Sequence, residues 1–395
     1  MATQDFGKSH LKLVVILGAL TAFAPLSIDM YLPAFPAIAA HFHASAGEVQ
    51  ATLAVYFVGL ALGQGVLGPL SDRTGRLPPM LLGIGAFVLG AVWAALSPNI
   101  ESLVAARFVQ ALGGCAGIVV SRAMVRDLFD ERTSAQVFSM LMLVMGLAPI
   151  LAPMIGGFLI AHYHWPVIFW CLAGFGLACF IAVWLGLGET LPREKRAHGG
   201  LGHVLRAYLG LFADGPFMAF SLANACISAA MFAYITGSPF VFITLLGFSP
   251  EHFAIVFGVN AFGLIAASQM NAFLLRRVSS GRTILGVSMT VHLAAALALV
   301  GASFYLPGSL ALLMACLFVL IGSIGFIGAN ATAAAMARAG ERIGAAAALT
   351  GIIQFALAAG AGALVGALND GTAMPMALAI AGLSLAGTAA RLFAR

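Results

Sequence analysis

The chain has 395 residues, of which 62% are hydrophobic and only 8% charged, and its mean hydropathy is +1.03. Soluble globular proteins carry roughly 25% charged residues. The composition therefore excludes soluble enzymes, nucleic-acid-binding proteins and disordered scaffolds, despite a net charge of +5. We expect a protein embedded in a lipid bilayer, with no nucleic-acid partner.

Twelve stretches are long and apolar enough for membrane helices, which need about 20 mostly apolar residues. Turn-forming and charged residues separate them, for example Ser71-Asp72-Arg73. The pattern predicts an all-α polytopic membrane protein of twelve transmembrane helices. In chain order the predicted spans are residues 12–35, 49–70, 79–97, 101–123, 135–160, 164–187, 216–243, 252–274, 283–302, 308–335, 343–367 and 371–392.

The basic residues predict the orientation, because Lys and Arg accumulate in cytoplasmic loops. Of the 19 basic residues, all except Arg107 lie at the start of the first span, in the central linker or beside the cytoplasmic end of another span. The opposite loops carry Glu48, Glu101, Glu251 and Asp370 but no Lys or Arg. We therefore expect both termini in the cytoplasm and a multi-pass location in the inner membrane. The first apolar run is too long for a cleaved signal peptide, and the five cysteines fall inside spans, so no disulfide framework is expected.

A polar segment, residues 188–213, separates six spans from six. A shift of 206 residues places Gly75-Arg76 on Gly281-Arg282 and Pro33 on Pro239. Paired halves with a site between them near the midplane are typical of secondary transporters. The predicted organisation is an N-terminal six-helix bundle over 1–187, a cytoplasmic linker over 188–213 and a pseudo-symmetric C-terminal six-helix bundle over 214–395.

Away from the loops and the span ends, two charges are expected to be buried: Asp29 in the first span and Arg107 in the fourth. Ionisable groups in a membrane core are costly unless they are paired or hydrated, so each is a functional candidate. The shift places Ile235 and Leu313 at the corresponding positions of the second half. One interpretation is proton coupling by Asp29 and Arg107; the other is a structural ion pair that locks the first half together. We favour proton coupling.

Two segments have residue compositions that are typical of regions involved in conformational change. The loop after the second span predicts a conformational latch in which Arg76 reaches a carboxylate, with ordinary topology charges as the alternative. The fifth span is rich in proline and glycine, which permit bending and close helix contact, so it is a hinge, a seal between halves or ordinary packing. The latch candidates are Gly68, Asp72, Gly75, Arg76 and Asp127, and the candidates in the fifth span are Gly146, Pro149, Pro153, Gly156 and Gly157.

These segments together resemble the major facilitator superfamily, specifically its twelve-span drug:proton antiporters. Residues 68–76 are similar to the signature of the loop between helices 2 and 3, and Arg107-Phe108-Val109-Gln110 to the helix 4 motif. Residues 152–157 resemble the antiporter motif of helix 5. Residues 27–34 resemble the bicyclomycin/chloramphenicol-resistance (Bcr/CflA) branch. Tyr56, Gly63-Gln64, Arg126-Asp127 and Ser238-Pro239-Phe240-Val241 resemble the same branch.

The resemblance implies a proton-coupled multidrug efflux antiporter that exports small lipophilic drugs of the chloramphenicol or bicyclomycin type by alternating access. The helix 4 arginine of the family is implicated in proton coupling. Thr21 stands where some related exporters carry a second acid, so Asp29 is expected to act alone. The alternative is a dedicated proton-coupled exporter of a metabolite such as an amino acid or a sugar.

A broad-specificity exporter is expected to have an apolar, aromatic pocket with few polar anchors. The partners are then a drug, protons and the bilayer; we expect a monomer that is not an enzyme. The proton gradient supplies the energy, and neither a cofactor nor a metal is expected, since no phosphate-binding loop is present. The candidate pocket residues are Tyr31, Tyr56, Gln64, Gln110, Met142, Asn224, Phe232, Tyr234, Phe240, Asn260, Asn330 and Gln354.

Overall fold

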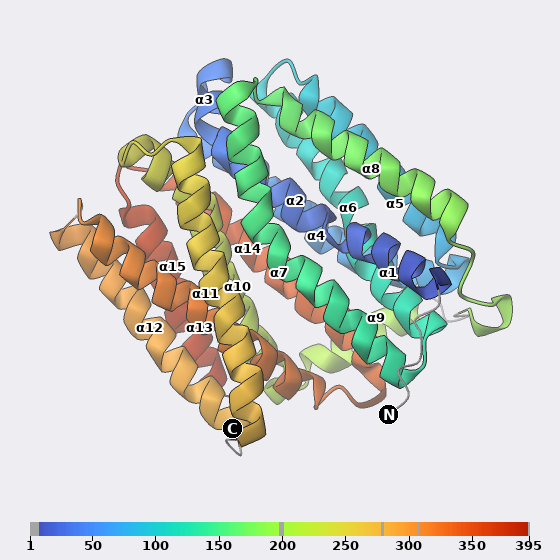
Figure 1. Ribbon diagram of the computed structural model, residues 1–395. Helices are drawn as coiled ribbons and strands as arrows, with labels where there is room; N and C mark the ends of the chain where they lie inside the picture. Colours follow the sequence, from blue (N-terminus) through green and yellow to red (C-terminus); the bar gives the residue numbers. More distant parts are fainter. Residues whose placement is uncertain (1–7, 197–200, 278–279, 307, 394–395) are drawn as a thin grey trace.

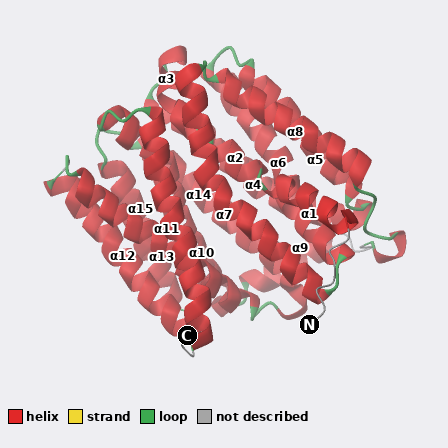
Figure 2. Ribbon diagram, viewed as in Figure 1, coloured by secondary structure: helices red, strands yellow, loops and turns green. Residues whose placement is uncertain are grey.

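A computed structural model describes residues 8–196, 201–277, 280–306 and 308–393. Within those ranges the regular secondary structure is helical throughout (Figure 2). Twelve helical segments there are long and apolar enough to cross a membrane, judged by length and composition. The predicted all-α polytopic fold is confirmed. Both chain ends, with Arg395, and linker residues 197–200 lie outside the described residues, and the cytoplasmic location of the termini stays a prediction.

The bounds of the helices match most predicted spans to within a few residues. The first half comprises α1 (Lys8–Thr21), α2 (Phe23–Asp29), η1 (Leu32–Ala34), α3 (Phe35–Phe42), α4 (Ala46–Thr74), α5 (Leu77–Ala95), α6 (Ile100–Leu128), α7 (Glu131–His162) and α8 (Pro166–Gly186). The linker and second half comprise η2 (Arg193–Lys195), α9 (Leu201–Phe212), α10 (Gly215–Pro239), η3 (Phe240–Leu245), α11 (Pro250–Arg277), α12 (Gly281–Tyr305), α13 (Leu310–Met336), η4 (Gly340–Arg342), α14 (Ile343–Ala367) and α15 (Met374–Leu392).

The helices form two groups that meet along a seam (Figure 1). In the first group α5 packs on α6 and α8, and α4 packs on α6; in the second, α12 packs on α13 and α10 packs on α15. The seam is formed where α4 contacts α14 and α7 contacts α11. Polar side chains start several of these helices: Ser45 and Glu48 form a capping box, and Asn99 caps α6. Such caps satisfy backbone N–H groups that lack a helical partner.

The first spanning segment is longer than the predicted span 12–35 and is interrupted, a feature that the prediction did not include. It runs on to Phe42 and is divided into α1, α2, η1 and α3, with a break directly after Asp29. Pro33 has no N–H to donate to the Asp29 carbonyl, so the α-helical ladder stops there and continues as a 3₁₀ turn. The predicted functional acid therefore lies at a helix end inside the bundle.

The equivalent proline of the second half produces a different irregularity. Pro239 ends α10 and is followed by a π-helical segment, η3. Pro239 lacks the N–H that would bond the Ile235 carbonyl, and the Ser238 hydroxyl donates to that carbonyl at 3.3 Å instead. The two positions related by the 206-residue shift are therefore both helix irregularities.

The linker contains a helix, α9, that the polar composition of 188–213 did not predict. Leu205, Leu209 and Phe212 recur at helical spacing and are exposed, while Leu211 is buried. α9 contacts α10 and α14 of the second group. The segment is an amphipathic helix that lies against the bundle, and its apolar periodicity was the overlooked signal.

Candidate functional site

Arg107 of α6 is fully buried inside a cage of aromatic rings. Its guanidinium carbon lies 4.1 Å from the centroid of the Tyr56 ring, 4.7 Å from that of Tyr31 and 5.8 Å from that of Phe169. A cation over an aromatic face is attracted by the negative centre of the ring, most strongly where water is excluded. The cage therefore holds a positive charge where membrane burial would otherwise disfavour it.

Hydrogen bonds complete the surroundings of Arg107. Nη1 donates to Oε1 of Gln110 at 2.7 Å. Nη2 donates at 3.0 Å to the carbonyl of Ser27, which lies in the last turn of α2. Among the residues that the structure describes, no carboxylate lies within 4.0 Å of this guanidinium. The buried charge is therefore held by rings, an amide and a carbonyl.

Asp29, at the end of α2, is 4% exposed, and its carboxyl group forms no hydrogen bond or ion pair with the residues that the structure describes. The structural Asp29–Arg107 ion pair, the alternative interpretation of the sequence, is therefore absent from this structure. The 3₁₀ turn η1 begins three residues after Asp29 and contacts α10 and α11 of the second half. In α10, the Tyr234 hydroxyl accepts a hydrogen bond from the Asn260 amide at 2.9 Å. Asp29 therefore lies beside a segment where the first half contacts the second.

Two residues that the sequence analysis missed position the cage. Thr52 of α4 shares a 2.8 Å hydrogen bond with the Tyr31 hydroxyl and donates to the Val49 carbonyl at 2.6 Å. Phe169 of α8 lies with its ring centroid 5.4 Å from that of Tyr31. Neither residue carries a sequence signal, because one threonine or phenylalanine in an apolar span resembles any other.

An aromatic cluster, defined as Phe57, Phe232 and Phe355, lies on the seam between the halves. These rings belong to α4, α10 and α14, with centroids 4.6 Å apart for Phe57 and Phe232, 5.7 Å for Phe232 and Phe355 and 6.4 Å for Phe57 and Phe355. Of the three, only Phe232 was a predicted pocket residue. Adaptable aromatic surface of this kind suits ligands of varied shape.

The remaining predicted pocket residues are dispersed. Gln64 lies on the seam against Gly351 of α14, and Asn224 is buried in α10. Asn330 of α13 donates to Asn271 at 2.7 Å and adjoins Gly281, the first residue of α12. Met142 of α7 is 54% exposed, and Phe240 and Gln354 are part-buried. Their contact with a ligand stays a prediction.

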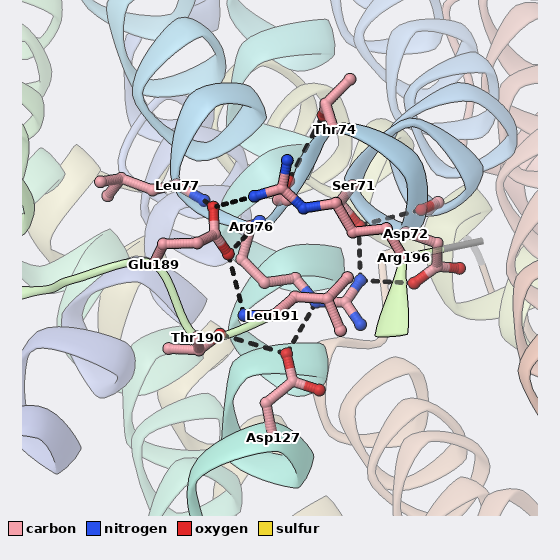
Figure 3. Close-up of polar contacts among 12 residues, drawn as sticks. Ser71, Asp72, Thr74, Arg76, Leu77, Asp127, Glu189, Thr190, Leu191 and Arg196 are labelled. Carbon is pink, nitrogen blue, oxygen red and sulfur yellow. Dashed lines mark hydrogen bonds and ion pairs between the residues drawn. The ribbon is translucent and has the colours of Figure 1, made fainter. Parts of the chain in front are cut away.

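The predicted latch residues do come together around one guanidinium (Figure 3). Arg76 forms an ion pair with Asp72 through Nη1 and another with Asp127 through Nε, at 2.8 Å from Oδ2. Nη1 also donates to the Ser71 hydroxyl at 3.0 Å, and that hydroxyl donates to the Gly68 carbonyl at 2.9 Å. One cation thus joins the loop after α4 to the end of α6.

Glu189, after α8, joins the same polar cluster around Arg76 and was not predicted from the sequence (Figure 3). Its carboxylate accepts the backbone N–H of Arg76 at 2.8 Å and that of Leu191 at 2.9 Å. Partial burial opposes ionisation, yet these N–H donors and the Arg196 charge hold the pKa of Glu189 below its usual range. Gly75 has φ +98°, and a Cβ there would collide with this carboxylate. Glycine is therefore required at the turn.

α7, the predicted antiporter helix, touches both halves through adjacent glycines. A Cβ on Gly156 would collide with the Met30 carbonyl oxygen, directly after Asp29. A Cβ on Gly157 would lie 2.9 Å from the Pro250 carbonyl oxygen, at the start of α11. Gly146 faces Ile265 of α11, and the helix stays continuous through Pro149 and Pro153. The close packing favours a seal over a hinge.

Comparison with known proteins agrees with this architecture. The family described as Major Facilitator Superfamily matches residues 17–367. An uncharacterized MFS-type transporter, YdgK of Bacillus subtilis, is 38% identical over 381 residues, covering 95% of this chain and 93% of the relative. A bicyclomycin resistance protein homolog of Haemophilus influenzae is 32% identical over 372 residues, covering 93% and 92%. The crystal structure of a mutant form of the nucleoside transporter NupG superposes with a TM-score of 0.75 at 13% identity, covering 96% and 99%.

Proposed function

Because the chain belongs to the major facilitator superfamily, and is thus an inner-membrane transporter and not an enzyme, we propose that it is a proton-coupled multidrug efflux antiporter. It would export small lipophilic drugs of the chloramphenicol or bicyclomycin type in exchange for protons. The similarity to a relative named for bicyclomycin resistance supports this substrate class. The proposed orientation puts both termini in the cytoplasm, as the distribution of basic residues predicts.

The observation that carries the proposal is the unpartnered Asp29 carboxyl group. It is buried at a helix end, and η1, which begins three residues later, contacts α10 and α11 of the second half. In a low-dielectric site the protonated carboxyl is neutral, whereas the ionised form needs water or a counter-charge. Gain and loss of one proton therefore changes which arrangement of the halves is favoured.

Arg107 supplies a fixed positive charge near this switch. Because two tyrosine rings, Gln110 and the Ser27 carbonyl hold the guanidinium, it stays in place whether or not Asp29 is ionised. In the proposed cycle a drug from the cytoplasm enters the seam and favours release of the proton from Asp29. The halves then reorient, the drug leaves outward, and a proton from outside returns Asp29 to its neutral form.

Transport assays in liposomes test the proposal. Purified protein is reconstituted with a pH-sensitive dye, and drug-evoked proton movement is recorded for a panel that includes chloramphenicol. We expect proton movement in the wild type, none in Asp29→Asn, and wild-type behaviour in the control Asp370→Asn, which removes an exposed loop carboxylate. Asp29→Asn is close to isosteric and removes the ionisable group.

Two other results would contradict the proposal. Unchanged proton movement in Asp29→Asn would show that this carboxyl group does not carry the proton. Proton movement evoked by amino acids or sugars but by no drug would identify the dedicated metabolite exporter instead.

A further inference from the structure

A cavity of about 670 Å³ lies at one end of the bundle. Its lining includes Arg73, Arg76, Arg126 and Arg342. Its walls come from α4 and α6 of the first half, α9 of the linker and α14 of the second half. Gln64 and Gly351 are in close contact where α4 meets α14, and Gln64 lines the cavity. The volume falls within the range of small-molecule pockets. The cavity shares none of its lining with the cage around Arg107.

The cavity carries an excess of positive charge. Its two acidic residues, Asp72 and Asp127, both bind Arg76. Arg122 and Arg126 also line it, one helical turn apart on α6, and Arg342 lines it from the start of α14. None of these last three arginines forms an ion pair with any acidic side chain that the structure describes.

Topology alone does not explain Arg122. Residues that orient a membrane protein lie in loops, whereas Arg122 is partly buried within α6, between the buried residues Ser121 and Met124. Like charges spaced by four residues on a helix repel each other, and partial burial raises that cost. An anion in the cavity would offset the repulsion.

The geometry also indicates which anion fits. Arginine binds phosphate oxygens through paired N–H donors, and a phosphate group offers enough oxygens for guanidinium groups on two walls. Gly344 and Ala345, in the first turn of α14, line the same cavity, and the N-cap residue Arg342 gives no side-chain cap. The positive end of the helix dipole adds to the attraction for an anion.

We propose that this cavity binds a phosphate-bearing anion, held by Arg122 and Arg126 of α6 and by Arg342 of α14. The anion is either a soluble phosphate compound or the headgroup of an acidic phospholipid. Because its ligands come from both halves, the bound anion ties α6 to α14 and stabilises the present arrangement of the halves. The inference rests on the arginines of this cavity and not on the proposed drug export or on the proton site at Asp29.

Thermal unfolding tests the proposal without a transport assay. The protein is placed in phosphatidylcholine nanodiscs and titrated with inorganic phosphate against chloride at equal ionic strength. A second arm compares nanodiscs of phosphatidylcholine with nanodiscs that also contain phosphatidylglycerol. The variants are Arg122→Gln, Arg342→Gln and the control Arg276→Gln, an exposed arginine at the end of α11 outside the cavity lining.

We expect the unfolding temperature to rise with inorganic phosphate if the source is soluble, or only with phosphatidylglycerol if it is a lipid. The ligand concentration that gives half of the maximal rise in unfolding temperature should increase about tenfold in Arg122→Gln and in Arg342→Gln, because each variant loses one charge-assisted contact. Arg276→Gln should leave that concentration unchanged. Arg342 is exposed, so its variant keeps the test decisive if Arg122→Gln fails to fold. The proposal is overturned if neither probe stabilises the wild type, or if Arg276→Gln weakens the response as much as the cavity variants.

Discussion

The guanidinium carbon of Arg107 lies 4.1 Å from the centroid of the Tyr56 ring, which places the planar cation over the aromatic face. Lysine carries the same charge but has neither the planar shape nor paired donors. Replacing Arg107 by lysine therefore distinguishes the effect of positive charge from the effect of guanidinium geometry at this position.

Arg107→Lys is expected to reduce drug-driven proton exchange by at least about tenfold, because an ammonium group cannot stack on both tyrosines while bonding Gln110 and Ser27. Initial rates in liposomes measure the effect, with Arg276→Lys as the matched control. Wild-type rates in Arg107→Lys would show that positive charge alone is sufficient.

Gly156→Ala should destabilise the protein by about 1–3 kcal/mol, since the added Cβ meets the Met30 carbonyl in a packed interface. Gly174→Ala in α8 is the matched control, because nothing lies within 4 Å of a Cβ there. Equilibrium unfolding in mixed micelles gives both values. Equal stability of the two variants would mean that α7 shifts freely away from the break after Asp29.

Ser238→Ala should cost about 1 kcal/mol, because the Ile235 carbonyl would lose the hydroxyl that replaces the missing N–H of Pro239. Ser384→Ala is the control: its hydroxyl donates to the Ile380 carbonyl at 2.6 Å, within a helix that has no proline at that point. That carbonyl keeps its backbone donor, so the change should be smaller. A larger loss in Ser384→Ala, measured by the same unfolding experiment, would refute this account of the proline.

Glu189 predicts a pH dependence of stability. Its pKa is lowered in the folded protein, so the folded state binds fewer protons than the unfolded state, and its contribution is fully present above the ordinary glutamate pKa near 4.5. That contribution is lost as pH falls through the lowered pKa. The wild type should therefore be more stable than Glu189→Gln near neutral pH, and the difference should shrink in acid.

Unfolding temperatures recorded from neutral to acidic pH measure that difference, with Glu101→Gln as an exposed-carboxylate control. A wild-type advantage over Glu189→Gln that stays constant down to strongly acidic pH would contradict the role given to this carboxylate.

The twelve spans were predictable because crossing a bilayer imposes a minimum apolar length on every helix. The clustering of Asp72, Arg76 and Asp127 was also foreseen, since a charged turn beside a helix end restricts the available partners. Glu189 was not, because it contacts Arg76 across 113 residues of sequence and nothing in the polar segment after α8 indicates that pairing. Phe57 and Phe355 could not be distinguished from the other members of a set of 29 phenylalanines.

The break after Asp29 was missed for a related reason. Prolines occur inside several membrane helices here, and Pro149 and Pro153 leave α7 continuous, whereas Pro33 lies in the 3₁₀ turn η1, directly after the break that follows Asp29. The difference depends on whether neighbouring helices support the freed carbonyls, which is a property of packing and not of the local sequence.

The aromatic cluster of Phe57, Phe232 and Phe355 has a mechanical consequence. Ring contacts between α4, α10 and α14 are held by dispersion forces that have little directional preference. These surfaces can therefore separate without leaving a polar atom without its hydrogen-bond partner. An interface built from hydrogen bonds would re-form in only one register. If the halves separate and close again as proposed, these ring contacts can re-form with ligands of different shape between them, so the aromatic cluster is compatible with a broad range of substrates.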